Sequence, residues 1–237
     1  MAMKVLIACE RFGVIRDAFI KAGHDAMSCD LVDTLAPGQH YAGDVRDILN
    51  AGWDLMIAHP DCTYLTNSAA WAYKDGPYHQ AVKPGTLVGA PRRAARVEAL
   101  EFVRLLMAAP IPRIAIENPI GVISTEILKP DQIIQPYEYG DDASKATCLW
   151  LKGLPKLTPT KFVEPRLVCS NCGTVFAYGQ HKCPECSSGQ YRPRWANQTN
   201  SGQNKLSPSD DRAMERAKTY QGWADAMVSQ WGLINGL

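Results

Sequence analysis

Cys62 and Glu117 are the residues whose types and positions indicate chemistry most directly. Each follows a short apolar run, 55–58 and 113–116, that predicts a buried strand. A thiolate at a strand end can act as a nucleophile, and a carboxyl group in an apolar crevice can keep a proton at neutral pH and donate it. Either residue alone has a plainer explanation, as a packing cysteine or as a strand-end cap or ion-pair partner. Their joint placement favours one shared reactive crevice.

Four further cysteines form two Cys-x-x-Cys pairs, Cys169 with Cys172 and Cys183 with Cys186, and ten residues separate the pairs. Four thiolates at this spacing can close tetrahedrally on one zinc ion, which would replace the hydrophobic core that so short a segment lacks. The alternative is a redox dithiol pair. We expect a structural zinc site, because four cysteine ligands leave no open coordination position. The nearby His181 is interpreted as a bystander.

The elements that must position these residues alternate between strand and helix. Lys4 to Cys9 predicts a buried strand, and Ala26 to Cys29 predicts a second that ends in Asp30. Helical spacing marks two connecting helices, one over 15–22 that Gly23 ends and one of about four turns. The residues that mark the four-turn helix are Val97, Leu100, Val103 and Met107. This alternation predicts a parallel sheet with helices on both faces, where ligands bind beyond the carboxyl ends of the strands.

The last third of the chain predicts an inserted module and a closing helix. Residues 159–209 are rich in Pro, Gly, Ser, Asn and Gln and contain both cysteine pairs. An apolar spacing then predicts one amphipathic helix, with Ser207 as cap and Pro208 in its first turn. The residues that define this spacing are Ala213, Ala217, Tyr220, Ala224, Met227 and Trp231. We therefore divide the chain into a core (1–160), a zinc-ribbon insert (161–196) and a C-terminal linker and helix that complete the core (197–237).

The composition limits the class of protein. The chain has 237 residues, of which 46% are hydrophobic and 21% charged, with a formal net charge of +1. These values exclude a disordered, collagen-like or disulfide-stapled chain. No apolar run is long enough to span a bilayer and no signal sequence opens the chain, so we expect a cytoplasmic protein without a membrane partner. The basic segments 83–113 and 161–222 are ordinary surface unless they lie beside a motif that needs a polyanion.

The order of the motifs resembles the cytosine-5 DNA methyltransferase family, particularly the short versions of phage and prophage genomes. The matching blocks are Cys9-Glu10-Arg11-Phe12-Gly13, Gly43-Asp44-Val45-Arg46-Asp47, His59-Pro60-Asp61-Cys62, Glu117-Asn118-Pro119, and Tyr139-Gly140 followed by Thr147 to Leu151. Tyr220 to Gly232 resembles the closing helix of the family. The resemblance covers about 4–157 and 205–232. It implies a Rossmann-like three-layer α/β methyltransferase sheet with helices on both faces, to which the zinc ribbon is a small insertion.

The resemblance also implies the roles of the residues. Cys62 would add to carbon 6 of cytosine, and Glu117 would contact ring nitrogen 3 and the exocyclic amine. S-adenosylmethionine would donate the methyl group, bound by Cys9, Glu10, Phe12, Gly13, Asp30, Leu31, Asp44, Val45 and Pro60. The substrate would be DNA with the target base flipped out or single-stranded, contacted by Asn118, Lys145, Arg192 and Arg194. A monomer in a bacterial or phage-infected cell is the implied form.

Three departures from the family pattern keep other functions open. Gly13 is the only glycine left in the first loop, and Asp61 stands in place of the second proline beside Cys62. Ser144 to Thr147 occupies the place of the Gln-x-Arg-x-Arg block. A literal match to that block, Gln190 to Arg194, follows the zinc module and is interpreted as a DNA-contacting basic stretch. No large recognition domain is present, so the insert, about 161–195, is the candidate DNA reader.

Two alternatives therefore remain beside a DNA cytosine methyltransferase. The first is a noncatalytic zinc-ribbon DNA-binding protein with a degenerate methyltransferase fold, motivated by Asp61 and the reduced glycine loop. The second applies the same chemistry to free deoxycytidine nucleotides, motivated by the small recognition region. A nicotinamide dehydrogenase is the least favoured, because the first loop lacks the Gly-x-Gly-x-x-Gly fingerprint.

Overall fold

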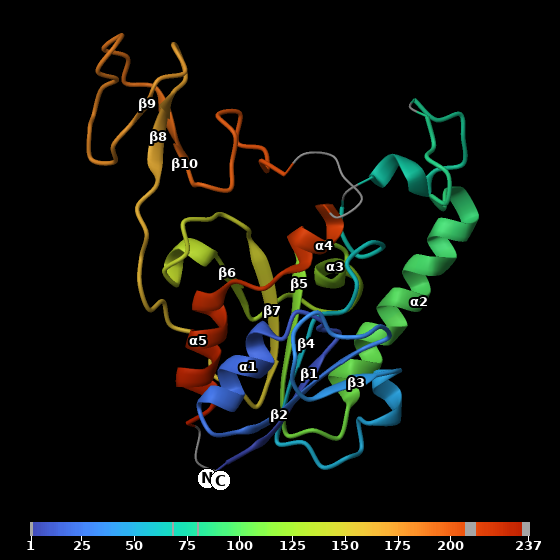
Figure 1. The fold of residues 1–237 in the computed structure, drawn as a ribbon. Coiled ribbons are helices and arrows are strands. Elements are labelled where there is room, and N and C mark those ends of the chain that lie inside the picture. The colour runs from blue at the N-terminus through green and yellow to red at the C-terminus, as the bar shows by residue number, and fades with distance from the viewer. Residues whose placement is uncertain (1, 68, 80, 207–211, 234–237) are drawn as a thin grey trace.

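A seven-stranded sheet forms the centre of the molecule, with the strand order β3-β2-β1-β4-β5-β7-β6 (Figure 1). This computed structural model describes residues 2–67, 69–79, 81–206 and 212–233. The strands are β1 (Lys4–Ala8), β2 (Asp25–Asp30), β3 (His40–Ala42), β4 (Leu55–Ala58), β5 (Arg113–Pro119), β6 (Gln132–Ile134) and β7 (Thr147–Lys152). Strands β3, β2, β1, β4 and β5 are parallel, and β7 is antiparallel to both β5 and β6.

Helices cover both faces of this sheet. Alternate residues of β1 face opposite sides, so Val5 and Ile7 pack with α1 (Val14–Lys21) and α5 (Gln221–Trp231). Leu6 and Ala8 pack in the other core with α2 (Gly89–Ala108). The short helices are η1 (Val45–Asp47), η2 (Ala70–Tyr73), α3 (Ile123–Glu126), η3 (Pro136–Glu138) and α4 (Arg212–Ala217). The predicted three-layer α/β fold is confirmed.

A second, three-stranded antiparallel sheet lies inside the predicted insert. It consists of β8 (Arg166–Cys169), β9 (Val175–Phe176) and β10 (Tyr191–Arg194), in the order β10-β8-β9. Its base is fixed to the core, because the ring of Trp195 stacks on Tyr137 with the centroids 4.4 Å apart and Arg166 pairs with Asp142 at 2.6 Å. The edges of this module are therefore anchored by packing and by charge.

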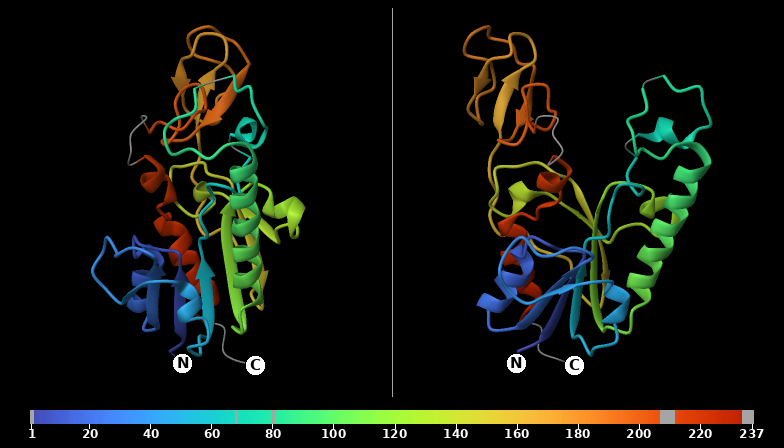
Figure 2. Two further views of the ribbon diagram at one scale, coloured as in Figure 1. Left: turned by 90° about the vertical axis from the view of Figure 1, so that its right-hand side faces the viewer. Right: turned by 45° about the vertical axis from the view of Figure 1, so that its right-hand side comes forward.

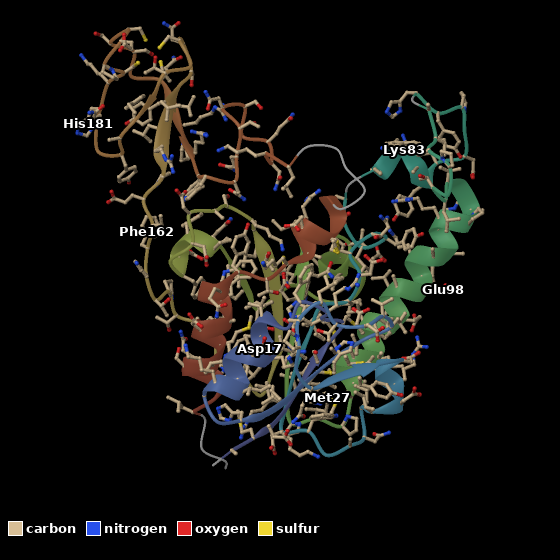
Figure 3. All side chains as sticks on the ribbon, viewed as in Figure 1. Asp17, Met27, Lys83, Glu98, Phe162 and His181 are labelled. Atoms are coloured by element: carbon tan, nitrogen blue, oxygen red, sulfur yellow. The ribbon has the colours of Figure 1, made fainter. Side chains whose placement is uncertain are left out.

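Two projections rise from the same end of the central sheet (Figure 2). One is the three-stranded module, and the other is an arm made of residues 69–79, 81–88 and the start of α2. Figure 3 shows His181 on the module and Lys83 on the arm. Both projections extend beyond the carboxyl ends of β4 and β5, where the sequence predicts the reactive crevice (Figures 1 and 2).

The four strands predicted in the first 120 residues are confirmed, with one extension. Strand β5 continues through Glu117, Asn118 and Pro119, which the sequence predicts to lie beyond its end. The reason is the antiparallel neighbour, because Glu117 pairs with Leu149 of β7. Gly23 follows α1 with a φ of 87°, as expected of a helix-ending glycine.

The predicted long helix before β5 is confirmed as α2, although its apolar face differs from the prediction. The helix begins at Gly89, eight residues before the first residue that marked it. Val97 is 58% exposed, whereas Leu100, Val103 and Leu106 are buried against the sheet. The amino-terminal half of α2 therefore extends past the sheet and into the arm (Figure 2).

The prediction of one C-terminal amphipathic helix is wrong, because α4 and α5 are separate. Tyr220 adopts an extended conformation, with a ψ of 140°, between the two helices. This break brings Gly222 against the core, where its backbone N–H donates to Asp141 at 3.1 Å. A Cβ on Gly222 would lie 2.0 Å from the carbonyl oxygen of Tyr139, so the approach requires glycine. The predicted cap, Ser207 with Pro208, lies outside the described residues.

Candidate active site

The central strands place Cys9, His59 and Glu117 at one level of the sheet. Ala8 of β1 pairs with Ala58 of β4, which pairs with Ile116 of β5. Cys9, His59 and Glu117, the residues that follow these three, therefore lie at the carboxyl edge, where binding sites of parallel sheets lie. The backbone N–H of His59 continues this register by donating to the carbonyl of Ala8 at 2.9 Å.

Glu117 is buried and tightly held. Its Oε2 lies 2.5 Å from Nδ1 of His59. Burial alone would raise the pKa of Glu117, but the hydrogen bond from His59 and the positive charge of Lys145 outweigh it and leave the pKa below its usual value. This differs from the expectation of a carboxyl group that keeps its proton. The arrangement instead favours a carboxylate that accepts hydrogen bonds.

Cys62 lies close enough to Glu117 and Lys145 for their charges to act on its thiol. Burial raises the pKa of Cys62, the Asp61 carboxylate raises it further, and the Lys145 ammonium lowers it. Asp61 accepts hydrogen bonds from the backbone and hydroxyl of Thr63, at 2.9 and 2.8 Å. The structure therefore brings the predicted pair, Cys62 and Glu117, into one electrostatic neighbourhood, with Lys145 as the third member.

The loop that carries Cys62 packs directly on the segment that follows Glu117. The backbone N–H of Val122 donates to the carbonyl of Leu65 at 2.8 Å. A Cβ on Gly121 would lie 2.0 Å from that same oxygen, so only glycine allows the contact. The side-chain amide of Asn118 donates to the carbonyl of Pro60 at 2.7 Å. These contacts fix the distance between the loop that follows β4 and the end of β5.

Two arginines of α2, which the sequence analysis did not single out, hold the Cys62 loop from the other side. Arg96 donates to the carbonyl oxygens of Tyr64 at 2.9 Å and Thr66 at 3.3 Å. Arg92 donates to the carbonyl of Thr63 at 3.4 Å. Both guanidinium groups also lie over the ring of Tyr73, at 4.8 Å for Arg92 and 3.4 Å for Arg96. The only signal in the sequence is two arginines four residues apart on one helix face.

Three of the predicted cofactor residues converge beside the end of β1. Cys9 is half-buried and has a φ of 59°, which is uncommon for a residue other than glycine. Burial raises the pKa of Cys9 to about 12, and the carboxylates of Asp30 and Asp44 add to this effect. Asp30 ends β2 and Asp44 follows β3, so the acidic groups come from neighbouring strands. Leu31 lies next to Asp30 and is 76% exposed.

The other predicted cofactor residues have structural surroundings of their own. A Cβ on Gly13 would lie 2.4 Å from the guanidinium of the buried Arg16, so this glycine makes room for packing. Phe12 lines a groove between α1 and α5. Val45 and Pro60 are buried.

Glu10 is buried beside these residues. Its Oε1 accepts a hydrogen bond from the backbone N–H of Ile15 at 3.0 Å. Burial raises the pKa of Glu10, while the charge of His59 lowers it to a smaller extent. His59, which the sequence analysis did not assign a role, therefore lies between Glu10 and Glu117. Its signal in the sequence is a titratable residue directly after an apolar strand.

The predicted substrate-binding cations fall into two places. Lys145 lies at the site, where its ammonium donates to the carbonyl of Arg216 at 3.0 Å and faces the ring of Trp223 at 5.8 Å. Arg192 and Arg194 lie on β10 of the three-stranded module, two residues apart and thus on the same face of the strand. The literal Gln-x-Arg-x-Arg match is therefore part of the module.

The four cysteines of the two Cys-x-x-Cys pairs form the predicted metal cluster. Their sulfur atoms all lie within 4.8 Å of one another, with Cys169 and Cys172 each 3.5 Å from a cysteine of the other pair. A hydrogen bond to Thr174 holds the pKa of Cys172 at about 6, which favours the thiolate. Soft thiolate ligands in a tetrahedral set suit zinc. Within the described residues, His181 is not part of this group.

No family model and no curated protein sequence matches the chain. Solved structures resemble it at low identity. A DNA modification methyltransferase encoded within an E. coli prophage has 14% identity and a TM-score of 0.44 over 68% of this chain and 52% of its own. The S. pombe Dnmt2 methyltransferase has 14% identity and a TM-score of 0.41 over 66% of this chain and 51% of its own.

A mutant of Spodoptera frugiperda DNMT2 has 15% identity and a TM-score of 0.37 over 68% of this chain and 54% of its own. The chain thus spans about half the length of the structures it matches. No helix in the described part of the chain is both long and apolar enough to cross a membrane.

Proposed function

We propose that this chain transfers a methyl group from S-adenosylmethionine to carbon 5 of cytosine in DNA, with Cys62 as the covalent nucleophile. The observation that carries this proposal is the shared neighbourhood of Cys62, Glu117 and Lys145 at the carboxyl edge of the sheet. A thiol nucleophile, a carboxylate and a cation are the three groups that addition to a cytosine ring requires.

The residues at the ends of β1, β2 and β3 fit the cofactor. The carboxylates of Asp30 and Asp44 both act on the half-buried Cys9, so both lie near the end of β1. Carboxylates accept hydrogen bonds from hydroxyl and amine groups, so Asp30 suits a ribose and Asp44 an adenine amine. The exposed Leu31 offers an apolar surface beside them. S-adenosylmethionine, when bound there, supplies the methyl group.

The residues around Cys62 supply the remaining chemistry. The Cys62 thiolate adds to carbon 6 while ring nitrogen 3 takes a proton from solvent, which makes carbon 5 nucleophilic. After carbon 5 takes the methyl group, with the thioether of the donor as leaving group, loss of the carbon 5 proton to solvent and of the nitrogen 3 proton expels the Cys62 thiolate and restores the aromatic ring. Glu117 accepts hydrogen bonds from the exocyclic amine and from a protonated ring nitrogen 3, and thereby selects cytosine over thymine. Lys145 stabilises the thiolate and the charge that develops on the ring. The target base must leave the duplex to reach these groups.

The zinc module supplies the contacts to the rest of the substrate. A structural zinc ion bound by Cys169, Cys172, Cys183 and Cys186 would hold the three-stranded sheet together, because its apolar core is small. Arg192 and Arg194, on one face of β10, are placed to contact phosphates. The module and the arm extend from the end of the sheet that carries Cys62 (Figure 2).

Methyl transfer tests this proposal. Wild-type chain is incubated with methyl-labelled S-adenosylmethionine and duplex DNA, single-stranded DNA or dCMP, and the nucleosides are analysed by mass spectrometry. We expect labelled 5-methyldeoxycytidine from DNA with the wild type and none with Cys62→Ser. DNA binding without any transfer would favour a noncatalytic binding protein. Transfer to dCMP alone would favour a nucleotide-modifying enzyme.

A further inference from the structure

Two buried carboxylates, Glu10 and Glu117, lie near the half-buried imidazole of His59 at the carboxyl edge of the sheet. Glu10 follows β1, His59 follows β4 and Glu117 lies at the corresponding level of β5. The imidazole Nδ1 of His59 is 2.5 Å from Oε2 of Glu117. On its far side, Nε2 of His59 and Oε2 of Glu10 are both buried and form no hydrogen bond with another described residue.

Glu10 and His59 interact despite the absence of a direct hydrogen bond between them. The charge of His59 is close enough to lower the pKa of Glu10, against the larger effect of burial. Buried polar groups without a partner are rare and costly, and titratable ones in perturbed surroundings cluster at functional sites. The Glu10 carboxylate also contacts the first turn of α1, through the backbone N–H groups of Ile15 and Arg16.

We propose that His59 is a positioning residue for Glu117, and that Glu10 in turn positions His59 from the other side. This inference rests on the proposed function, because Glu117 is the group that would contact the base. The Nδ1–H of His59 donates to Oε2 of Glu117 and limits rotation of the carboxylate, so its remaining lone pairs point in fixed directions toward the substrate. Glu10 thus serves the catalytic carboxylate, and it replaces the cofactor role that the sequence resemblance implies for it.

The surrounding charges are consistent with this arrangement. Arg16 faces Glu10 from α1, and Lys145 faces Glu117 from the segment before β7. Cys62 and Cys148 face Glu117 from the adjacent loop and strand. None of these groups donates a hydrogen bond to Oε2 of Glu117 or to His59 Nε2. The side chain of Thr147, the first residue of β7, also forms a hydrogen bond with the Glu117 carboxylate. His59, with Nδ1 at 2.5 Å from Oε2, is thus one of two side chains that orient Glu117.

Nuclear magnetic resonance of histidine labelled with nitrogen-15 tests the interactions of His59 with Glu117 and Glu10 without any activity measurement. In the wild type, we expect a strongly deshielded Nδ1 proton on His59, as a short hydrogen bond to a carboxylate produces. Glu117→Gln should remove this signal, and Glu10→Gln should shift the nitrogen resonances of His59. The exposed Glu98→Gln on α2 (Figure 3) is the matched control and should leave them unchanged. Unchanged His59 resonances in Glu10→Gln would overturn the role of Glu10, and an unchanged Nδ1 proton in Glu117→Gln would overturn the whole proposal.

Kinetics then separates positioning from simple structure. His59→Asn keeps an N–H near the position of Nδ1, whereas His59→Leu removes it. We expect kcat for methyl transfer to fall about 100-fold in His59→Leu and about tenfold in Glu10→Gln, with partial recovery in His59→Asn. Calorimetry should show S-adenosylmethionine binding unchanged in all three variants. Weaker cofactor binding in Glu10→Gln with kcat unchanged would contradict the proposal. A wild type that methylates nothing would defeat the proposed function. The resonance experiment would still show whether Glu10, His59 and Glu117 interact.

Discussion

At the scale of single residues, the charges around Cys62 decide how readily it becomes a nucleophile. The thiolate is the reactive form, so its fraction at a given pH sets the rate of attack. Burial and Asp61 raise the pKa of Cys62, and Lys145 lowers it. Asp61 points its carboxylate at Thr63, which holds it beside the thiol. Asp61 therefore lowers the fraction of Cys62 that is thiolate, and Lys145 partly offsets this effect.

Replacing Asp61 should make Cys62 more reactive. In Asp61→Asn the pKa of Cys62 falls, because a negative charge that raises it is gone, so the pH profile of alkylation moves to lower pH. We expect iodoacetamide to label the Cys62 peptide roughly two to three times faster at pH 7.5, because the pKa of Cys62 falls by about a few tenths. Lys145→Met should move the profile the opposite way, and the distant Asp25→Asn should not move it. Identical profiles in Asp61→Asn and wild type would contradict this electrostatic account.

At the scale of elements, the helix α2 does more than cover the sheet. Its carboxyl-terminal half packs Leu100, Val103 and Leu106 into the core, and its other half carries Arg92 and Arg96 to the Cys62 loop. A loop held by several charged hydrogen bonds loses less conformational entropy when substrate binds. The basic character of 83–113 thus has a structural use in part, beside the phosphate contacts expected from the sequence.

Removing one of these arginines should therefore impair activity more than a surface arginine does. Arg96→Ala loses the hydrogen bonds to Tyr64 and Thr66 and the contact with Tyr73. We expect the free energy of unfolding to fall by about 1–3 kcal/mol and kcat to fall about tenfold. Arg104→Ala, on the same helix and paired with Glu101 on the surface, should change stability by less than about 1 kcal/mol. Equal kcat values for the two variants would show that the loop does not depend on Arg96.

The sequence predicts the central elements better than their ends and partners. Lys4 to Ala8, Leu55 to Ala58 and the start of β5 are short apolar runs, and their burial follows directly from composition. The end of β5 depends on pairing with β7, more than 25 residues away, and no local pattern shows this. The break at Tyr220 depends on the contact of Gly222 with Asp141. The same limit explains why His59 and the α2 arginines were missed, since their roles are visible only through their partners.

At the scale of the whole molecule, two projections flank the end of the sheet that carries the site. The three-stranded module has its own small core of Leu167, Cys169, Phe176 and Cys183, separate from the two cores of the central sheet. It contacts the core through Tyr137, Trp195 and the Arg166–Asp142 pair. The stability of the three-stranded module therefore depends on the cysteine cluster, whereas the stability of the central sheet does not.

Loss of zinc should disorder the module and leave the core folded. We expect one zinc per chain by mass spectrometry of metals, and none in Cys183→Ser. Thermal unfolding of that variant should keep the main transition, because the central sheet has its own cores, while DNA affinity falls. Cys148→Ser is a matched cysteine variant outside the cluster and should keep its zinc. A Cys183→Ser chain that retained both zinc and an ordered module would contradict a four-cysteine structural site.

Covalent capture of the substrate tests the proposed chemistry most directly. DNA in which 5-fluorocytosine replaces cytosine should trap the chain, because fluorine at carbon 5 blocks the release of the ring from sulfur after addition and methyl transfer. We predict a denaturation-resistant protein–DNA product that requires S-adenosylmethionine, with peptide mass spectrometry placing the bond on Cys62 and no product from Cys62→Ser. A product bonded through another residue, or none from a wild type that binds both DNA and cofactor, would contradict the account.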